Sequence, residues 1–126
     1  MLPASRFPKR GEIWFVRLPT DPPDKGRRPV IVVSVDARNR HERAATVLVI
    51  PLTTSIHTPS PFQVLLSAGE TGLPADSAAR ADNVTVVQKS DLSPPLMRLR
   101  QVSGNRICEI ANKVALAMGC LDSARN

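Results

Sequence analysis

Short apolar runs separated by polar turns make up most of the chain before residue 90. The runs are rich in β-branched residues, which favour extended backbone, and they are too short for buried helices. Polar residues 36–45, between two of these runs, predict a hairpin, and a bend at Asp82 separates the last two runs. We therefore predict strands at Glu12–Leu18, Pro29–Ser34, Thr46–Leu52, Phe62–Leu66, Ala79–Ala81 and Asn83–Gln88.

The end of the chain has a helical period instead. Ser103 is a good N-cap residue, and Gly119 lies near the predicted end of the helix. A short turn and strand that contain Met97 and Leu99 precede it. Because the links between strands are too short for crossover helices, the predicted fold class is mostly β with a C-terminal helix, as an antiparallel barrel or an α+β sheet. The apolar stripe of the helix, which we expect in the core, contains Ile107, Ile110, Ala111, Val114, Ala117, Met118 and Leu121.

Composition and charge restrict the partners. The 126 residues are expected to form one domain, and 42% hydrophobic residues supply its core. The formal net charge of +6 indicates an acidic partner, such as nucleic acid, an anionic membrane surface or an acidic protein.

Cys108 and Cys120 form no CxxC or metal motif, so we expect neither a disulfide nor a metal. Without a secretory signal or an apolar run of membrane-spanning length, we expect a soluble cytoplasmic protein with no membrane partner.

Two polar clusters at strand ends are the candidates for chemistry. Residues 19–29 hold four prolines and predict a conformationally restricted loop that leads through Arg27 and Arg28 into a strand. Guanidinium donors at this place could clamp a phosphate, or they could be ordinary surface charges. Residues 53–55, Thr-Thr-Ser, follow another strand, and their hydroxyls could bind phosphate oxygens or form local turns.

The order of these segments resembles one known family. GEIWFVRL is followed by GRRPVIVVS, VLVIPLTTS, PFQVLL, ARADNVTVV with KSDL, and the helix. From about Gly11 to Leu121 this order is similar to that of the PemK/MazF toxins of bacterial toxin-antitoxin systems, and GRRP followed by PLTTS is its most specific part. The resemblance implies an SH3-like antiparallel β-barrel, related to the toxin CcdB, that works as a homodimer. It also implies a cognate antitoxin, similar to MazE, whose acidic, disordered C-terminal segment covers the site.

The resemblance further implies a metal-independent endoribonuclease, without a cofactor, that cuts single-stranded RNA at a short sequence. The ribose 2′-hydroxyl attacks the adjacent phosphate and leaves a 2′,3′-cyclic phosphate and a 5′-hydroxyl. The catalytic positions of the family correspond to Arg28 and Thr53 here. An arginine stabilises charge on the phosphate oxygens and a threonine holds a second oxygen, but arginine is a poor base. Many members carry Ser-Glu-Gln before the arginine, and in this chain Asp24 is the nearest loop carboxylate.

Other residues are expected to contact RNA or to support the fold. Trp14 is expected in the core or at a dimer edge. The alternatives to a nuclease are a gyrase poison that acts through protein contacts, like CcdB, and a nucleic-acid-binding barrel without catalysis. The expected RNA-binding residues are Lys25, Arg27, Thr54, Ser55, His57, Arg80, Asp82 and Asn83. Basic side chains that could line an RNA groove are Arg17, Lys25, Arg27, Arg38, Arg40, Arg43 and Arg80.

Overall fold

Six strands and a long C-terminal helix are the main elements of the described chain. The computed structural model describes residues 7–56, 59–95 and 97–120. Both the strands and the helix confirm the prediction from sequence, whereas α1 and α2, of four residues each, are additional. The strands are β1 (Ile13–Val16), β2 (Arg28–Val32), β3 (Thr46–Thr53), β4 (Gln63–Leu66), β5 (Ser77–Arg80) and β6 (Thr85–Gln88). The helices are α1 (Asp36–Asn39), α2 (Ala68–Thr71) and α3 (Gly104–Ala117), with 3-10 turns η1 (Pro23–Lys25), η2 (Ala81–Asn83) and η3 (Lys89–Asp91).

The strands form an antiparallel sheet in the order β1-β2-β3-β5-β4, and β6 also pairs with β3. The long strand β3 is shared, since residues 46–49 pair with β6 and its end pairs with β5. Pro51 lies where β3 changes partner, a place that tolerates a residue without an N–H.

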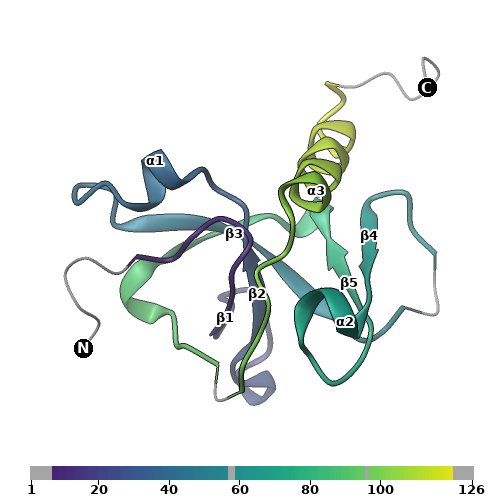
Figure 1. Ribbon diagram of the computed structural model, residues 1–126, viewed down its shortest axis with the longest axis horizontal. Helices are drawn as coiled ribbons and strands as arrows, with labels where there is room; N and C mark the ends of the chain where they lie inside the picture. Colours follow the sequence, from purple (N-terminus) through teal and green to yellow (C-terminus); the bar gives the residue numbers. More distant parts are fainter. Residues whose placement is uncertain (1–6, 57–58, 96, 121–126) are drawn as a thin grey trace.

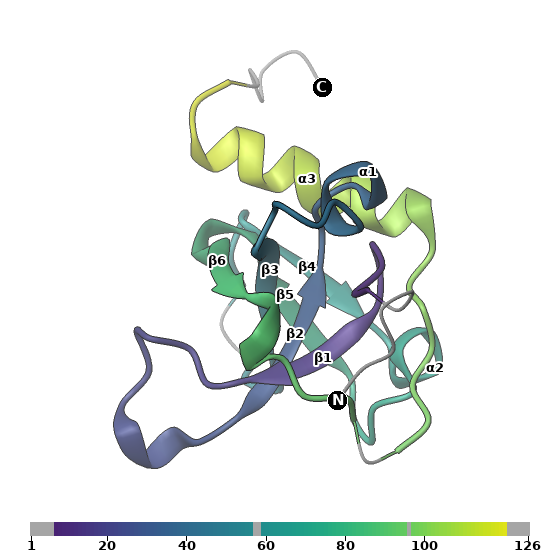
Figure 2. The ribbon, with the colours of Figure 1, turned by 90° about the vertical axis from the view of Figure 1, so that its left-hand side faces the viewer.

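A backbone bridge between Ser93 and Phe15 returns the chain to β1 and curls the sheet into the expected barrel (Figures 1 and 2). Apart from this bridge, no strand forms in the described residues 93–95 and 97–99. The expected short strand before the helix is therefore absent, and Pro94 and Pro95, which lack N–H donors, explain why.

The curled sheet has a hydrophobic cluster on each face. Side chains along β2 alternate between the two, because Ile31 belongs to the cluster under α3 while Val30 and Val32 belong to the other. This is the two-residue period of a strand that is buried on both faces. Trp14, 2% exposed, lies in the second cluster, which confirms its expected place in the core. Burial of a large apolar side chain stabilises the fold by about 1.5–3 kcal/mol.

Helix α3 packs on the first cluster through Ile107, Ile110 and Val114. Ser103 Oγ accepts a hydrogen bond from the backbone N–H of Arg106, which confirms the predicted N-cap. Ile107 and Ile110 are buried and Val114 is half-buried, whereas the end of the helix rises away from the sheet (Figure 1) and is exposed. The expectation that the whole stripe is core is therefore confirmed for Ile107, Ile110 and Val114 and wrong for the exposed members, and Leu121 lies outside the described residues. The exposed members of the stripe are Ala111, Ala117 and Met118.

Arg106 ties α3 to α2 and β4. Its Nε donates to Glu70 Oε1 at 2.8 Å, and its Nη2 donates to the backbone oxygen of Leu65. Glu70 also closes a capping box by accepting a hydrogen bond from the backbone N–H of Ser67 at 2.9 Å. That hydrogen bond, and secondly the charge of Arg106, holds the pKa of Glu70 below its usual value despite partial burial. The spacing Ser67-x-x-Glu70 is the signal in the sequence from which α2 could have been predicted.

Replacement of Gly11 by alanine is expected to lower the free energy of unfolding by about 2 kcal/mol or more. Gly11 has a φ of +91°, and a Cβ there would lie 2.6 Å from the backbone oxygen of Val102. Urea unfolding followed by circular dichroism measures the loss. Gly26→Ala is the control, because its φ is +68° but no atom of the described residues lies within 4 Å of the added Cβ. We expect only about 1 kcal/mol from backbone strain there, and equal losses in both variants would contradict the steric explanation.

Candidate active site

The pairing of β2 with β3 brings Arg28 and Thr53 together. The two strands pair in the register Val30↔Pro51, and the same register continued by two residues sets Arg28 opposite Thr53. Directly opposed side chains of antiparallel strands share one face, with Cβ atoms about 5 Å apart. The two polar clusters that the sequence singles out, residues 26–29 and 53–55, therefore meet at one end of the sheet.

The guanidinium of Arg28 is held by two partners. Its Nη2 donates to the backbone oxygen of Leu52 at 3.2 Å, and its Nη1 donates to Asp21 Oδ1 at 3.2 Å and Oδ2 at 3.4 Å. The side chains of Arg28 and Asp21 are 18% and 12% exposed, so the ion pair is largely shielded from water. A guanidinium has five N–H donors, and these contacts leave some of them for an anion. The guanidinium of Arg28 is thus held in one orientation while some of its N–H donors remain available to a ligand.

The loop carboxylate beside the arginine is Asp21. Its backbone N–H donates to the backbone oxygen of Leu18 at 3.1 Å, and two prolines follow it, so a turn and two rigid rings fix its position. Proximity in sequence favours Asp24 instead, but Asp24 lies exposed in η1, and its carboxylate pairs with no described residue. Asp21 is therefore the site residue that sequence analysis misses, because only the folded loop reveals its contact with Arg28.

A cavity of about 450 Å³ opens beside Arg28 and Thr53. Thr53 Oγ1 accepts a hydrogen bond from the backbone N–H of Ser55 at 3.1 Å, which is the local turn named above as one alternative. The hydroxyl hydrogen of Thr53 is still available to a ligand oxygen. A guanidinium and several hydroxyls around one cavity are groups that bind phosphate. The polar residues of the lining are Lys25, Arg28, Thr53, Thr54, Ser55 and Ser77, and the apolar ones are Phe15, Pro29, Leu52, Leu73, Pro74, Ala75 and Met97.

Three of the expected RNA-binding residues lie away from this cavity. Arg80 is at the far end of β5 and pairs with Asp82, with 3.8 Å between Nε and Oδ1. Asn83 shares the turn η2 with Asp82, and this turn packs against α3. None of the three lines the cavity beside Arg28. His57, also expected to bind RNA, lies outside the described residues.

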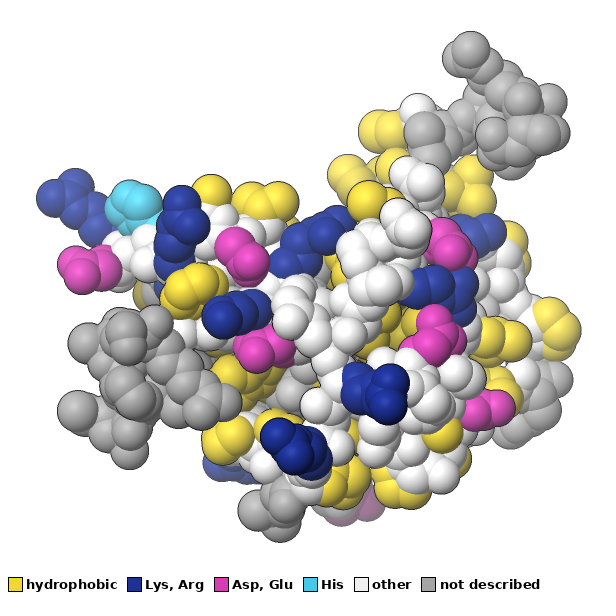
Figure 3. Space-filling model, in the orientation of Figure 1, with side chains coloured by type: hydrophobic (Ala, Val, Ile, Leu, Met, Phe, Trp, Pro, Cys, Tyr) yellow, Lys and Arg dark blue, Asp and Glu magenta, His cyan; other side chains and the backbone are white. Residues whose placement is uncertain are grey.

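The basic residues expected to line one RNA groove lie in separate parts of the fold. Arg38 lies in α1 and donates to the backbone oxygen of Thr46 at 2.7 Å, and Arg40 and Arg43 follow it in the chain. Figures 1 and 2 both place α1 far from the loop between β1 and β2, and in Figure 3 the Lys and Arg side chains are spread among neutral and acidic ones. Arg27, by contrast, lines a hollow that adjoins the Arg28 cavity, and Arg17 lines a further hollow that shares Arg27.

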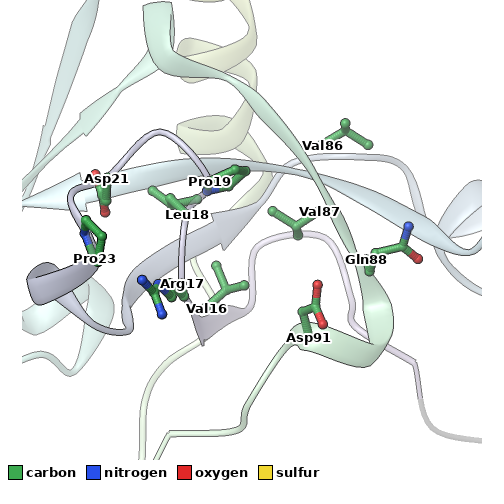
Figure 4. A pocket seen from close by; sticks show the side chains of 10 residues that line it. All are labelled: Val16, Arg17, Leu18, Pro19, Asp21, Pro23, Val86, Val87, Gln88 and Asp91. Carbon is green, nitrogen blue, oxygen red and sulfur yellow. The ribbon is translucent and has the colours of Figure 1, made fainter.

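A second cavity, of about 460 Å³, lies on the other side of Asp21 (Figure 4). It occupies the seam of the barrel between the end of β1 and β6, where Leu18 and Val87 supply apolar lining. Asp91 points into the same space from η3 (Figure 4). Asp21 lines this second cavity, and its carboxylate binds Arg28, which lines the first.

Residues 7–56, 59–95 and 97–120 hold neither a candidate metal cluster nor a helix that could span a membrane. Within these ranges no group of three or more His, Cys, Asp or Glu residues is placed to hold a metal ion. The same residues contain no helix long and apolar enough to cross a bilayer. The groups that the Arg28 cavity offers to a ligand are therefore cations, hydroxyls and apolar side chains.

Comparison with known proteins identifies relatives over most of the chain. Residues 9–118 match the family model described as PemK-like, MazF-like toxin of type II toxin-antitoxin system. Endoribonuclease MazF9 of Mycobacterium tuberculosis (strain ATCC 25618 / H37Rv) is 37% identical over 99 residues, which are 72% of this chain and 81% of the relative. Probable endoribonuclease MazF5 of the same organism is 37% identical over 102 residues, which are 81% of this chain and 87% of the relative.

Solved structures share the fold. An endoribonuclease in complex with its cognate antitoxin, from a mycobacterial species, superposes with a TM-score of 0.70 at 27% identity and covers 91% of this chain and 98% of that one. MazF from Deinococcus radiodurans has a TM-score of 0.69 at 20% identity, with coverage of 90% and 98%, and shows the same barrel. Both clusters of the Arg28 cavity lie within the matched residues, and the chain belongs to the PemK-like, MazF-like toxins of type II toxin-antitoxin systems.

Proposed function

We propose that this toxin is an endoribonuclease that cleaves single-stranded RNA at a short sequence in the cavity beside Arg28 and Thr53. The main support is the geometry of that cavity, where an arginine oriented by Asp21 and a threonine hydroxyl face one space. The two mycobacterial relatives, which are named endoribonucleases, support the same activity. The compartment that fits this substrate is the cytoplasm.

The proposed reaction is an internal transfer within the RNA. The ribose 2′-oxygen bonds to the adjacent phosphorus while the bond from phosphorus to the 5′-oxygen breaks. The 2′-hydroxyl loses a proton and the leaving 5′-oxygen gains one, which gives a 2′,3′-cyclic phosphate and a 5′-hydroxyl. Negative charge grows on the non-bridging oxygens, and Arg28 and Thr53 donate to them. Preorganised donors of this kind stabilise the transition state by about 3–4 kcal/mol each.

Lys25, Thr54 and Ser55 line the same cavity and are proposed to bind the RNA backbone on either side of the cut. Contacts between basic residues and phosphates release counterions, so RNA binding should weaken steeply as salt rises. Roles in RNA binding for His57, Arg80, Asp82 and Asn83 stay predictions, because the last three lie outside this cavity and the first outside the described residues.

Incubation of the purified protein with a long single-stranded RNA in EDTA tests the proposed function. We expect cleavage at a recurring short sequence, with 2′,3′-cyclic phosphate and 5′-hydroxyl ends identified by end-group analysis. RNA that is bound but left intact would contradict the nuclease assignment, and inhibition of DNA gyrase would then be the next assay.

The partner protein is proposed to be a cognate antitoxin with an acidic, disordered C-terminal segment. One structural neighbour is an endoribonuclease in complex with its cognate antitoxin, which supports a partner of this kind. The net charge of +6 and the cations around the Arg28 cavity attract an acidic segment. Such a segment would fold on binding and block the entry of RNA.

A homodimer is also proposed, and an exposed apolar patch on β3 and β6 is the surface it would cover. Leu48 and Val86 face each other in the strand register and are 36% and 52% exposed, and Val84, beside β6, is 38% exposed. Val86→Lys is expected to shift the protein toward monomer, because the ammonium would be buried in an apolar contact. Sedimentation velocity measures the change, with Leu65→Lys, at an exposed residue of β4, as the control. A monomeric wild type would contradict the proposal.

A further inference from the structure

An apolar hollow of about 360 Å³ adjoins the Arg28 cavity. Phe15 and Met97 line both spaces, so the hollow and the cavity share a wall. The neighbouring arginines divide between them, since Arg28 lines the cavity and Arg27 lines the hollow. The remaining lining of the hollow is Ser93 and Pro94.

The walls of the hollow are held in place by the fold. Phe15 is half-buried in β1 and packs against the first hydrophobic cluster, so the ring is supported from one side. Opposite it, the segment with Ser93 and Pro94 is fixed by two backbone hydrogen bonds, Phe15 N–H to Ser93 oxygen at 2.9 Å and Ser93 N–H to Phe15 oxygen at 2.8 Å. Met97, 43% exposed, closes another side with a flexible, polarizable side chain. The hollow is therefore formed before any ligand arrives.

We propose that this hollow is a subsite for an RNA base, namely the base of one of the two nucleotides joined by the scissile phosphate. The inference rests on the proposed function, which places that phosphate at Arg28. A base and its phosphate are joined through a single ribose, so a base subsite has to adjoin the phosphate site, as this hollow does. An aromatic ring, a thioether and a guanidinium are groups on which a base stacks.

The lining also predicts how selective the subsite is. Apart from the Ser93 hydroxyl and Arg27, the hollow offers few groups that could read the hydrogen-bonding edge of a base. Stacking accepts every base, because each has a π-face. The subsite therefore requires a base but discriminates little among the four, and the cleavage sequence should be degenerate at this position.

Cleavage of short RNA substrates tests the subsite. Each nucleotide flanking the cut is replaced in turn by the other bases and by an abasic ribonucleotide that keeps its 2′-hydroxyl. At one of the two positions we expect the abasic substrate to have a kcat/KM about tenfold lower, while the four bases differ by no more than about threefold. No abasic effect at either position, or a strong preference for one base at the position that shows it, would overturn the proposal.

Two variants test whether the loss of kcat/KM on the abasic substrate (the abasic effect) arises in the hollow. Phe15→Leu keeps an apolar side chain against the core but removes the ring, and Met97→Ala shortens an exposed side chain. Both should shrink the abasic effect to less than about twofold, because the stacking contact is already lost. Met118→Ala is the matched control, since Met118 is 72% exposed at the end of α3, and it should keep the full effect. An undiminished effect in both Phe15→Leu and Met97→Ala would overturn the subsite.

The same substrates separate this proposal from the proposed function. Wild-type protein that leaves every base-containing RNA intact contradicts the nuclease itself. Wild-type protein that cuts RNA without any abasic effect contradicts only the base subsite.

Discussion

Arg28→Ala is expected to lower kcat/KM for RNA cleavage about a hundredfold to a thousandfold. The guanidinium is held by Leu52 and Asp21, it has further N–H donors, and Arg28 lines the cavity. Its removal takes away a preorganised donor from the oxygens on which charge develops in the transition state. Initial rates on a short substrate, with subsaturating and saturating RNA, measure the loss in kcat and in kcat/KM.

Arg40→Ala is the matched control for Arg28→Ala. It removes the same charge, but Arg40 is exposed beside α1, far from the loop between β1 and β2 (Figure 2). Arg28→Ala also leaves the carboxylate of Asp21 without its partner, so unfolding of the variant has to be measured and the assay run where it is folded. Activity within about threefold of wild type in folded Arg28→Ala would contradict the assigned role.

Asp21→Asn is expected to lower kcat about tenfold to a hundredfold, with no rise in KM, because it loosens the orientation of Arg28. The amide oxygen can accept one N–H, but it lacks the charge that holds the guanidinium. A less negative site does not weaken attraction of RNA, so the loss should appear in kcat. Asp21→Glu, which keeps the charge, should recover part of the activity. Steady-state kinetics on the three proteins measure this split.

Asp24→Asn is the control for Asp21→Asn. It makes the same change of charge three residues further along the same loop, at an exposed carboxylate that pairs with no described residue. Equal losses in the two variants would mean that the charge of the loop matters and not the contact with Arg28. A rise in activity in Asp21→Asn would mean that the carboxylate competes with the phosphate for Arg28.

The strands and the central pair of the site could be predicted because both follow from local patterns. Alternation of side chains along a strand fixes which residues of β2 enter which cluster, as Val30 and Ile31 show. Once β2 and β3 pair antiparallel, the register alone sets Arg28 opposite Thr53. The structure thus brings the GRRP and PLTTS segments to one cavity, and their catalytic role stays a prediction.

Residues outside the strands could not be placed in this way. The contact of Asp21 with Arg28 depends on how a proline-rich loop folds back, and spacing in sequence favours Asp24. The helical period predicts where an apolar stripe runs but not how far along the helix the core reaches, so Met118 is exposed although it belongs to the stripe. The positions of basic residues in the sequence do not reveal that the Arg38 guanidinium donates to the backbone oxygen of Thr46 instead of facing the cavity.

The shared strand β3 supports the two halves of the candidate active site unequally. Arg28 belongs to the ladder of β1, β2 and β3, whereas Thr53 pairs with Ala78 of β5, beyond the change of partner at Pro51. Local opening of the hairpin β4–β5 would release the neighbour of Thr53 and leave the support of Arg28 intact. We therefore expect the toxin to lose activity in mild denaturant before its amides in β1 and β2 lose protection from hydrogen exchange.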